Sequence, residues 1–189
     1  MSRIEKGTYG YRDQYKKRQI GYISFFGALI LVGLGVRFLA DFSYHTALGS
    51  IAAVLAAIPL ANILSPFVVL YPWKTMKKED YDQYSAREKD FRILYDLIIT
   101  TKEDVMVMDV LVVHPTGIYG WCTNPKVVTD RAEDNVNNTL AAMHLDPNFH
   151  VIKDRKVFDK RFDSLKPASE YEDDGTVNYA VEVLEKISV

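Results

Sequence analysis

The stretch IGYISFFGALILVGLGV, residues 20–36, decides the fold, because it runs for seventeen residues without a charged side chain. Phe38–Ala40 extend it beyond Arg37, so the apolar stretch covers residues 20–40. The hydrocarbon core of a bilayer is about 30 Å thick, and about 20 helical residues are enough to cross it. We therefore expect residues 20–40 to form a transmembrane helix.

A second uncharged stretch follows from residue 42 to residue 73, and a second span fits within it over residues 47–71. Two buried core helices of a soluble protein and a cleaved signal peptide are the alternatives. The length of both stretches argues against core helices, and the presence of a second span argues against a signal peptide. The sequence predicts an uncleaved transmembrane hairpin of two helices in residues 20–73.

Charged side chains are distributed unevenly around this hairpin. Residues 1–19 carry six basic and two acidic side chains, and residues 74–189 begin with three lysines in their first five positions. The turn of the hairpin has no Lys or Arg after Arg37. Basic flanks face the cytoplasm by the positive-inside rule. We expect an integral protein of the cell membrane with a basic cytoplasmic N-terminus (1–19), the hairpin (20–73), a cytoplasmic domain (74–189) and both termini in the cytoplasm.

Small residues recur every four positions in the second span, at Gly49, Ala53, Ala57 and Ala61. Residues four apart lie on one helix face, and small side chains let helix backbones approach each other in a lipid bilayer. This stripe can pack the two spans together or join two copies of the chain into a homo-oligomer. No ionisable residue lies in the apolar centre of either span, so we expect a membrane anchor rather than a channel or transporter.

The pattern of residues 74–189 predicts a small α/β (α+β) domain of order α-β-β-β-α-β with further helices at the C-terminus. Residues at intervals of three and four mark the first helix, and β-branched residues mark the strands. Asp130 and Glu133 resemble a capping box at the start of the second helix. The expected elements are a helix through Tyr81, Tyr84, Glu88 and Phe91, an antiparallel meander of strands 94–100, 105–114 and 118–123, helix 131–144, strand 149–153, and helices 157–165 and 177–187.

Asp109 is the one charged residue in the apolar strand at 105–114, on the side that we expect to carry Val107 and Leu111. A carboxylate there is costly unless it is paired, bound to a metal or placed at the sheet margin. The run MDVLVVHPTGIY, residues 108–119, resembles the centre of the nuclease-related domain, a branch of the PD-(D/E)xK nuclease-like superfamily. That family has an aspartate in an apolar strand, a turn with glycine, an aromatic residue and then a Glu-x-Lys pair. The resemblance covers residues 81–153 and implies the same order of core elements.

The chain departs from this pattern at the Glu-x-Lys pair. In the family the aspartate and the glutamate bind Mg²⁺ and the lysine steadies the attacked phosphate. Asp109 matches, and Glu88 corresponds to an acid that some members carry on the helix, but Cys122 stands in place of the glutamate and Asn124 in place of the lysine. Mg²⁺ takes oxygen ligands, so one carboxylate beside a thiol is a poor site. The resemblance therefore implies a nuclease-like domain without catalysis.

Two functions remain open for a chain with Glu88, Asp109 and Cys122 as its candidate catalytic residues. We expect a membrane-anchored, non-catalytic binding or scaffolding protein with an unidentified protein partner and no cofactor. The alternative is a membrane-tethered nuclease or phosphodiesterase that binds Mg²⁺ or Mn²⁺ through Asp109 and Glu88. Cys122 could also be a nucleophile with His114 or His144 as its base, although free cysteines in apolar strands are usually buried hydrophobes. Nucleic-acid binding is not expected, since the cytoplasmic part has sixteen basic and twenty-two acidic side chains.

Overall fold

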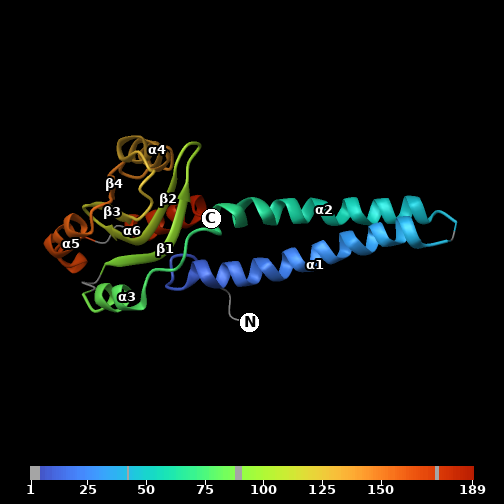
Figure 1. Cartoon of the computed structure of the whole chain (residues 1–189). Coiled ribbons are helices and arrows are strands. Elements are labelled where there is room, and N and C mark those ends of the chain that lie inside the picture. The colour runs from blue at the N-terminus through green and yellow to red at the C-terminus, as the bar shows by residue number, and fades with distance from the viewer. Residues whose placement is uncertain (1–4, 42, 88–90, 173–174) are drawn as a thin grey trace. The chain divides into compact units, whose positions relative to one another are not determined.

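The computed structural model describes residues 5–41, 43–87, 91–172 and 175–189 of the 189-residue chain. The chain forms two compact units. One is helical and runs from Asp13 to Pro72, and the other combines the described residues up to Arg12 with Trp73–Val189. The coarse expectation of two long apolar helices followed by an α/β domain is confirmed (Figure 1). Of the N-terminal segment 1–19 that we expected to stand apart, residues 5–12 contribute to the α/β unit and residues 13–19 to the helical unit.

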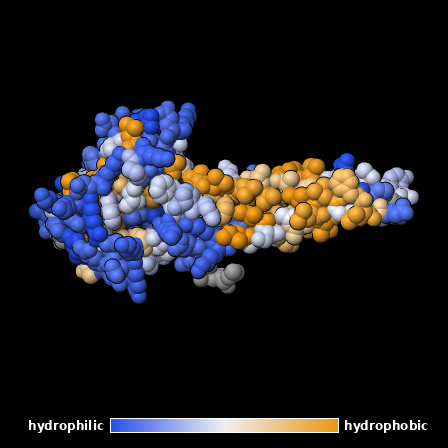
Figure 2. All heavy atoms as spheres, viewed as in Figure 1, coloured by the Kyte–Doolittle hydropathy of each residue, from blue (hydrophilic) through white to orange (hydrophobic). Residues whose placement is uncertain are grey.

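Two helices make up the helical unit, α1 (Tyr11–Leu39) and α2 (His45–Leu70). The first two residues of α1 precede the start of this unit at Asp13. Both are long and apolar enough to cross a membrane. Only 6% of the apolar window of α1 and 11% of that of α2 are buried, whereas a core helix of a soluble protein would bury most of its residues. Figure 2 shows a hydrophobic surface along most of these helices and hydrophilic residues at their connecting loop. The expected spans, 20–40 and 47–71, each end one residue later than the observed helix.

Glycines bring the backbones of α1 and α2 into contact. A Cβ atom on Gly49 would lie 2.5 Å from the carbonyl oxygen of Gly33 and 2.6 Å from the backbone nitrogen of Arg37. A Cβ atom on Gly33 would lie 2.9 Å from the carbonyl oxygen of Gly49. These distances are shorter than van der Waals contact and involve backbone atoms, so both positions require glycine.

The stripe of small residues lies only partly in this contact. Gly49 and Ala53 lie against Gly33, whereas Ala57 and Ala61 are exposed and Ala56 is buried. A helix completes a turn every 3.6 residues, so positions at a spacing of four move gradually off the contact face. The contact between the helices therefore uses one end of the stripe.

A four-stranded mixed sheet of order β1-β2-β3-β4 forms the centre of the α/β unit. Its strands are β1 (Arg92–Thr100), β2 (Val105–His114), β3 (Gly117–Cys122) and β4 (Phe149–Ile152). The first three form the expected antiparallel meander, and β4 pairs with β3 in parallel. The parallel pair requires a crossover connection, which contains helix α4 (Thr129–Ala142).

Helices cover both faces of this sheet. Helices α4 and α6 (Thr176–Ile187) pack on one face, where Val136 and Leu184 are fully or almost fully buried in what we call the α4/α6 core. Helices α3 (Lys78–Ser85) and α5 (Arg155–Ser164) pack on the other face, where Tyr84 and Phe158 are fully buried in the α3/α5 core. The domain thus has three layers with the sheet in the middle, and a short 3₁₀ helix, η1 (Ala168–Glu170), precedes α6.

Two local expectations need correction. Helix α3 ends at Ser85, so Phe91 lies outside it, although its ring packs in the same core as Tyr84. The expected capping box is wrong, because α4 begins after Val128 and no side chain caps it. Glu133, which we expected to take part in that box, instead accepts a hydrogen bond from strand β4.

Helix α4 protects the outer edge of β4. Glu133 Oε1 accepts a hydrogen bond from the Val151 N–H (2.6 Å), and Asn137 Oδ1 accepts one from the Phe149 N–H (2.8 Å). Residues four apart on a helix rise about 6 Å, and residues two apart on a strand rise about 6.6 Å, so the two spacings match. The backbone donors of an edge strand otherwise invite pairing with another chain.

We predict that the double substitution Glu133→Ala and Asn137→Ala lowers the free energy of unfolding by about 2 kcal/mol, because it leaves two edge donors without acceptors. It should also promote self-association through β4. Chemical unfolding and sedimentation velocity in detergent measure the two effects. The exposed neighbours provide the control, since Asp134→Ala with Asn138→Ala should change neither measurement. Equal behaviour of the two double variants would contradict the edge-protecting role.

Candidate functional site

The pairing between β1 and β2 is interrupted at two aspartates. Asp96 of β1 and Asp109 of β2 stand opposite each other but do not pair, although the residues on both sides of them do. Asp96 has a φ of 57°, in the left-handed region that non-glycine residues seldom adopt. Asp109 lies at a bulge, where the register between β2 and β3 shifts. The bulge reverses the alternation of faces, so the expectation that Asp109 shares a face with Leu111 is wrong: Leu111 packs in the α4/α6 core and Asp109 contacts Arg12.

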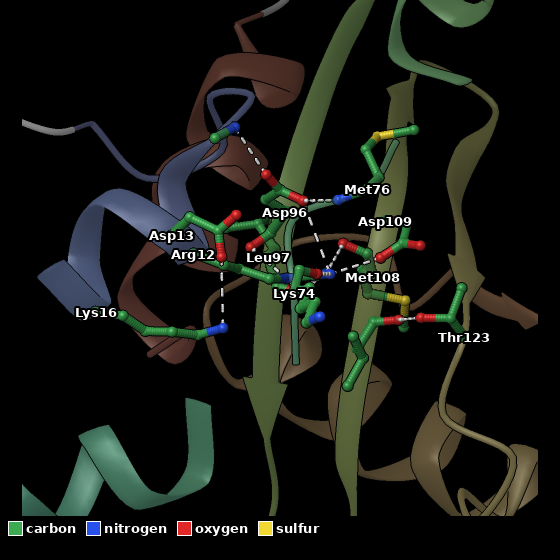
Figure 3. A network of polar contacts seen from close by, with 12 residues as sticks. Arg12, Asp13, Lys16, Lys74, Met76, Asp96, Leu97, Met108, Asp109 and Thr123 are labelled. Atoms are coloured by element: carbon green, nitrogen blue, oxygen red, sulfur yellow. Dashed lines mark hydrogen bonds and ion pairs between the residues drawn. The ribbon is translucent and has the colours of Figure 1, made fainter. Parts of the chain in front are cut away.

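The guanidinium group of Arg12 fills this interruption (Figure 3). Arg12 is only 1% exposed, and its nitrogen atoms donate to four backbone carbonyl groups and one carboxylate. The acceptors are the carbonyl oxygens of Lys74 (3.0 Å), Asp96 (3.1 Å), Leu97 (3.1 Å) and Met108 (2.7 Å), and Asp109 Oδ1 (2.6 Å). Buried carbonyl groups need hydrogen-bond donors, and where the ladder is interrupted the arginine supplies them.

The carboxylate of Asp96 binds backbone donors that lie far apart in the sequence. Asp96 is fully buried, its Oδ2 accepts from the Gly10 N–H (2.8 Å), and its Oδ1 accepts from the Met76 N–H (3.1 Å). Arg12 Nη1 lies 3.7 Å from Asp96 Oδ1. Gly10 precedes α1 and Met76 follows α2. The Arg12–Asp96–Asp109 network therefore holds the chain both where it leaves the α/β unit and where it returns.

One guanidinium pairs with two carboxylates in this network, that of Asp96, which is fully buried, and that of Asp109, which is 13% exposed. Burial raises the pKa of Asp96 above its ordinary value, while Arg12 and the two backbone donors act in the opposite direction. Burial also raises the pKa of Asp109, and this is opposed by Arg12 and by a hydrogen bond with Thr123. An uncompensated charge inside a protein costs several kcal/mol, so Arg12 is the group that makes these carboxylates tolerable in the sheet.

Cys122 and Asn124, which stand at the Glu-x-Lys positions, make their main contacts with groups other than Asp109. Cys122 is 1% exposed and packs in the α4/α6 core opposite Met108, and burial raises the pKa of its thiol. Asn124 Nδ2 donates to the Val105 carbonyl oxygen (2.7 Å). Thr123, between them, donates its hydroxyl group to the Val107 carbonyl oxygen (3.4 Å) and helps to hold down the pKa of Asp109.

Glu88 lies outside the described residues. Within the ranges that the structure does describe, no group of three or more His, Cys, Asp or Glu side chains is placed to hold a metal ion. His114, a possible base for Cys122, hydrogen-bonds instead to Thr116 and to the Lys166 carbonyl oxygen.

Comparisons of the chain with protein-family models, curated protein sequences and solved structures found no match. The resemblance to the nuclease-related domain therefore stays a prediction. The site is a buried arginine between two aspartates, with every acceptor around it supplied by the α/β unit.

Sequence reasoning missed Arg12 and Asp96. Arg12 counted only as one of the basic residues before the first span, and nothing in its neighbours distinguishes it from Arg18. Asp96 did carry a signal, because it is a charged residue in an apolar strand, as Asp109 is. Two such aspartates in neighbouring antiparallel strands indicate a shared partner.

Proposed function

We propose that this chain is a membrane-anchored, non-catalytic binding or scaffolding protein. The hairpin lies in the cell membrane, both termini lie in the cytoplasm, and the α/β unit binds a protein partner there. Two helices long and apolar enough to cross a membrane support the anchor. The basic residues before α1 and after α2 support the orientation.

The contact between Arg12 and Asp109 is the observation that carries this proposal. A carboxylate that ligates a divalent ion must turn its oxygen atoms toward that ion, whereas Asp109 Oδ1 lies 2.6 Å from a guanidinium nitrogen. Arg12 stands in the first turn of α1 and also binds the Lys74 carbonyl oxygen, a few residues beyond α2. Asp109 thus serves to hold both connections of the hairpin to the sheet, which is a structural role.

Labelling of single cysteines tests the orientation. In a Cys122→Ala background, we expect a membrane-impermeant maleimide on intact cells to label Ser43→Cys and to spare Lys16→Cys and Lys78→Cys. Both spared positions should become reactive after permeabilisation, which serves as the control. Labelling of Lys78→Cys alone from outside would overturn the hairpin topology, and labelling of both Lys16→Cys and Lys78→Cys would invert it.

Calorimetric titration with Mg²⁺ and Mn²⁺ tests the non-catalytic reading. The full chain in nanodiscs is the right sample, because a fragment that starts at residue 74 would lack Arg12. We expect no saturable heat. The metal-dependent nuclease alternative predicts a saturable heat that disappears in Asp109→Asn, so this result would replace the scaffolding proposal.

A further inference from the structure

Basic side chains gather beside both spans at one end of the hairpin. Residues 14–19, before the apolar stretch of α1, and residues 71–78, after α2, include six charged side chains, and all six are basic. They are Lys16, Lys17, Arg18, Lys74, Lys77 and Lys78. The nearest acids in the sequence lie outside these segments, at Asp13 and Glu79. The two segments therefore carry only positive charge.

Three of these bases lie next to a span and are exposed to solvent. They are Lys17, Arg18 and Lys74, and none of them forms an ion pair with a carboxylate in the described part of the chain. Lys16 differs, because its Nζ lies 3.5 Å from Asp13 Oδ1. We call Lys17, Arg18 and Lys74 the basic collar.

The positions of these three residues match the headgroup layer of a bilayer that contains the hairpin. A helix rises about 1.5 Å per residue, so Lys17 and Arg18 lie about 3–4.5 Å before the apolar stretch that starts at residue 20. Lys74 directly follows Trp73, whose amphipathic ring is of the kind found at membrane interfaces. The Lys74 carbonyl oxygen accepts a hydrogen bond from Arg12 (3.0 Å), which holds this lysine beside the first turn of α1 (Figure 3).

The side chain of Arg18 extends away from the apolar stretch. Its guanidinium carbon lies 5.5 Å from the centre of the Tyr15 ring, three residues nearer the start of α1. A cation–π contact uses the face of the guanidinium and not its N–H donors. Because Arg18 is exposed, these donors can reach a headgroup phosphate.

The charges of the remaining chain make this attraction selective. Residues 79–189 carry thirteen basic and twenty-two acidic side chains, a formal net charge of −9. At the other end of the hairpin, residues 37–46 carry one base and one acid, and the base, Arg37, donates to Ser50 Oγ (2.7 Å). A negatively charged surface therefore attracts the chain at the basic collar and at Lys77 and Lys78, and repels residues 79–189.

We propose that the basic collar binds the headgroups of anionic phospholipids, so that the protein gathers these lipids around this end of its spans. The inference rests on the membrane anchor proposed above and adds the class of lipid that the anchor selects. An anionic headgroup keeps its negative charge and accepts hydrogen bonds from an ammonium or guanidinium group. In phosphatidylcholine the choline cation cancels the charge of the phosphate. Each base therefore prefers an anionic headgroup to a zwitterionic one.

Quenching of Trp73 fluorescence by brominated lipids measures this preference. The full chain with Trp121→Phe keeps Trp73 as its one tryptophan. The vesicles contain equal amounts of phosphatidylglycerol and phosphatidylcholine, and one of the two lipids is brominated on its acyl chains. Bromine quenches fluorescence at short range, so a pair of such samples compares how often each lipid lies beside Trp73.

We expect phosphatidylglycerol to bind beside Trp73 about fivefold more tightly than phosphatidylcholine in about 0.1 M salt, the effect of one base beside one headgroup charge. In about 1 M salt, where the screening length is about 3 Å, this preference should fall by at least half. The salt series needs no variant of the collar.

Two triple variants with the same change in net charge locate the preference. The collar variant carries Lys17→Gln, Arg18→Gln and Lys74→Gln, and the control variant carries Lys102→Gln, Lys126→Gln and Lys156→Gln. The control residues are exposed lysines from other parts of the α/β unit. We expect the collar variant to bind the two lipids about equally and the control variant to keep the preference. An equal loss of preference in the two variants would overturn the proposal.

The same samples separate this inference from the membrane anchor. A chain anchored in the bilayer is quenched by both brominated lipids, whatever the charge of their headgroups. Equal quenching by the two lipids before any change to the collar would refute the lipid selectivity and leave the anchor in place. Fluorescence that neither lipid quenches would overturn the anchor, and the selectivity with it.

Discussion

Replacement of Arg12 by methionine should lower the free energy of unfolding of the α/β unit by about 3–5 kcal/mol, the usual effect of removing one partner from a buried ion pair. The substitution leaves Asp109 without its guanidinium partner and several carbonyl groups without donors. Unfolding in urea, followed by the fluorescence of Trp121 in a Trp73→Phe background, measures this loss. Trp121 suits the purpose because it packs against the α3/α5 core.

Two further variants separate the charge of Arg12 from its hydrogen bonds. Adding Asp109→Asn to Arg12→Met removes one unpaired charge, so it should recover part of the lost stability. Arg12→Lys keeps the charge but concentrates its donors on one nitrogen atom, and it should fall between wild type and Arg12→Met. A loss below about 1 kcal/mol in Arg12→Met would mean that the network contributes no more than an exposed pair does.

Substitution of glycine by leucine should separate the helices of the hairpin at position 49 and leave them in place at position 35. A side chain on Gly49 would collide with the backbone of Gly33 and Arg37, which can yield only if α1 and α2 move apart. A side chain on Gly35 meets nothing within 4 Å. Spin labels at the exposed positions Leu31 and Ile51 report the separation by pulsed electron resonance in nanodiscs.

The matched alanine pair makes the comparison sharper. Gly33→Ala and Gly35→Ala lie two residues apart in the same helix, and alanine favours a helix over glycine by up to about 1 kcal/mol at both. Only Gly33→Ala places its Cβ within 3.0 Å of the α2 backbone. We expect a longer or broader distance distribution for Gly33→Ala and an unchanged one for Gly35→Ala. Identical distributions for the two would show that backbone contact at Gly33 does not hold the hairpin.

The interruption of the sheet explains why sequence patterns located Asp109 but misread its surroundings. The expected strand at 105–114 matches β2 to the residue, because period and composition are local properties. The direction of its side chains is not a local property, since the bulge at Asp109 reverses which face of the sheet the later residues occupy. The role of Glu133 was misread for a related reason. A glutamate at this position in the sequence fits a capping box and an acceptor for a neighbouring strand equally well, and only the fold shows which role it has.

The sequence by itself determined the two long apolar helices and the antiparallel meander, because length, hydropathy and short turns act between residues that are close in the chain. Only the tertiary structure decided what Asp109 does. Its partner Arg12 lies 97 positions away in the sequence. No local pattern encodes such a pairing: the energy of a buried charge depends on which groups the fold brings within a few ångströms of it, and that is settled only when the sheet closes around the arginine.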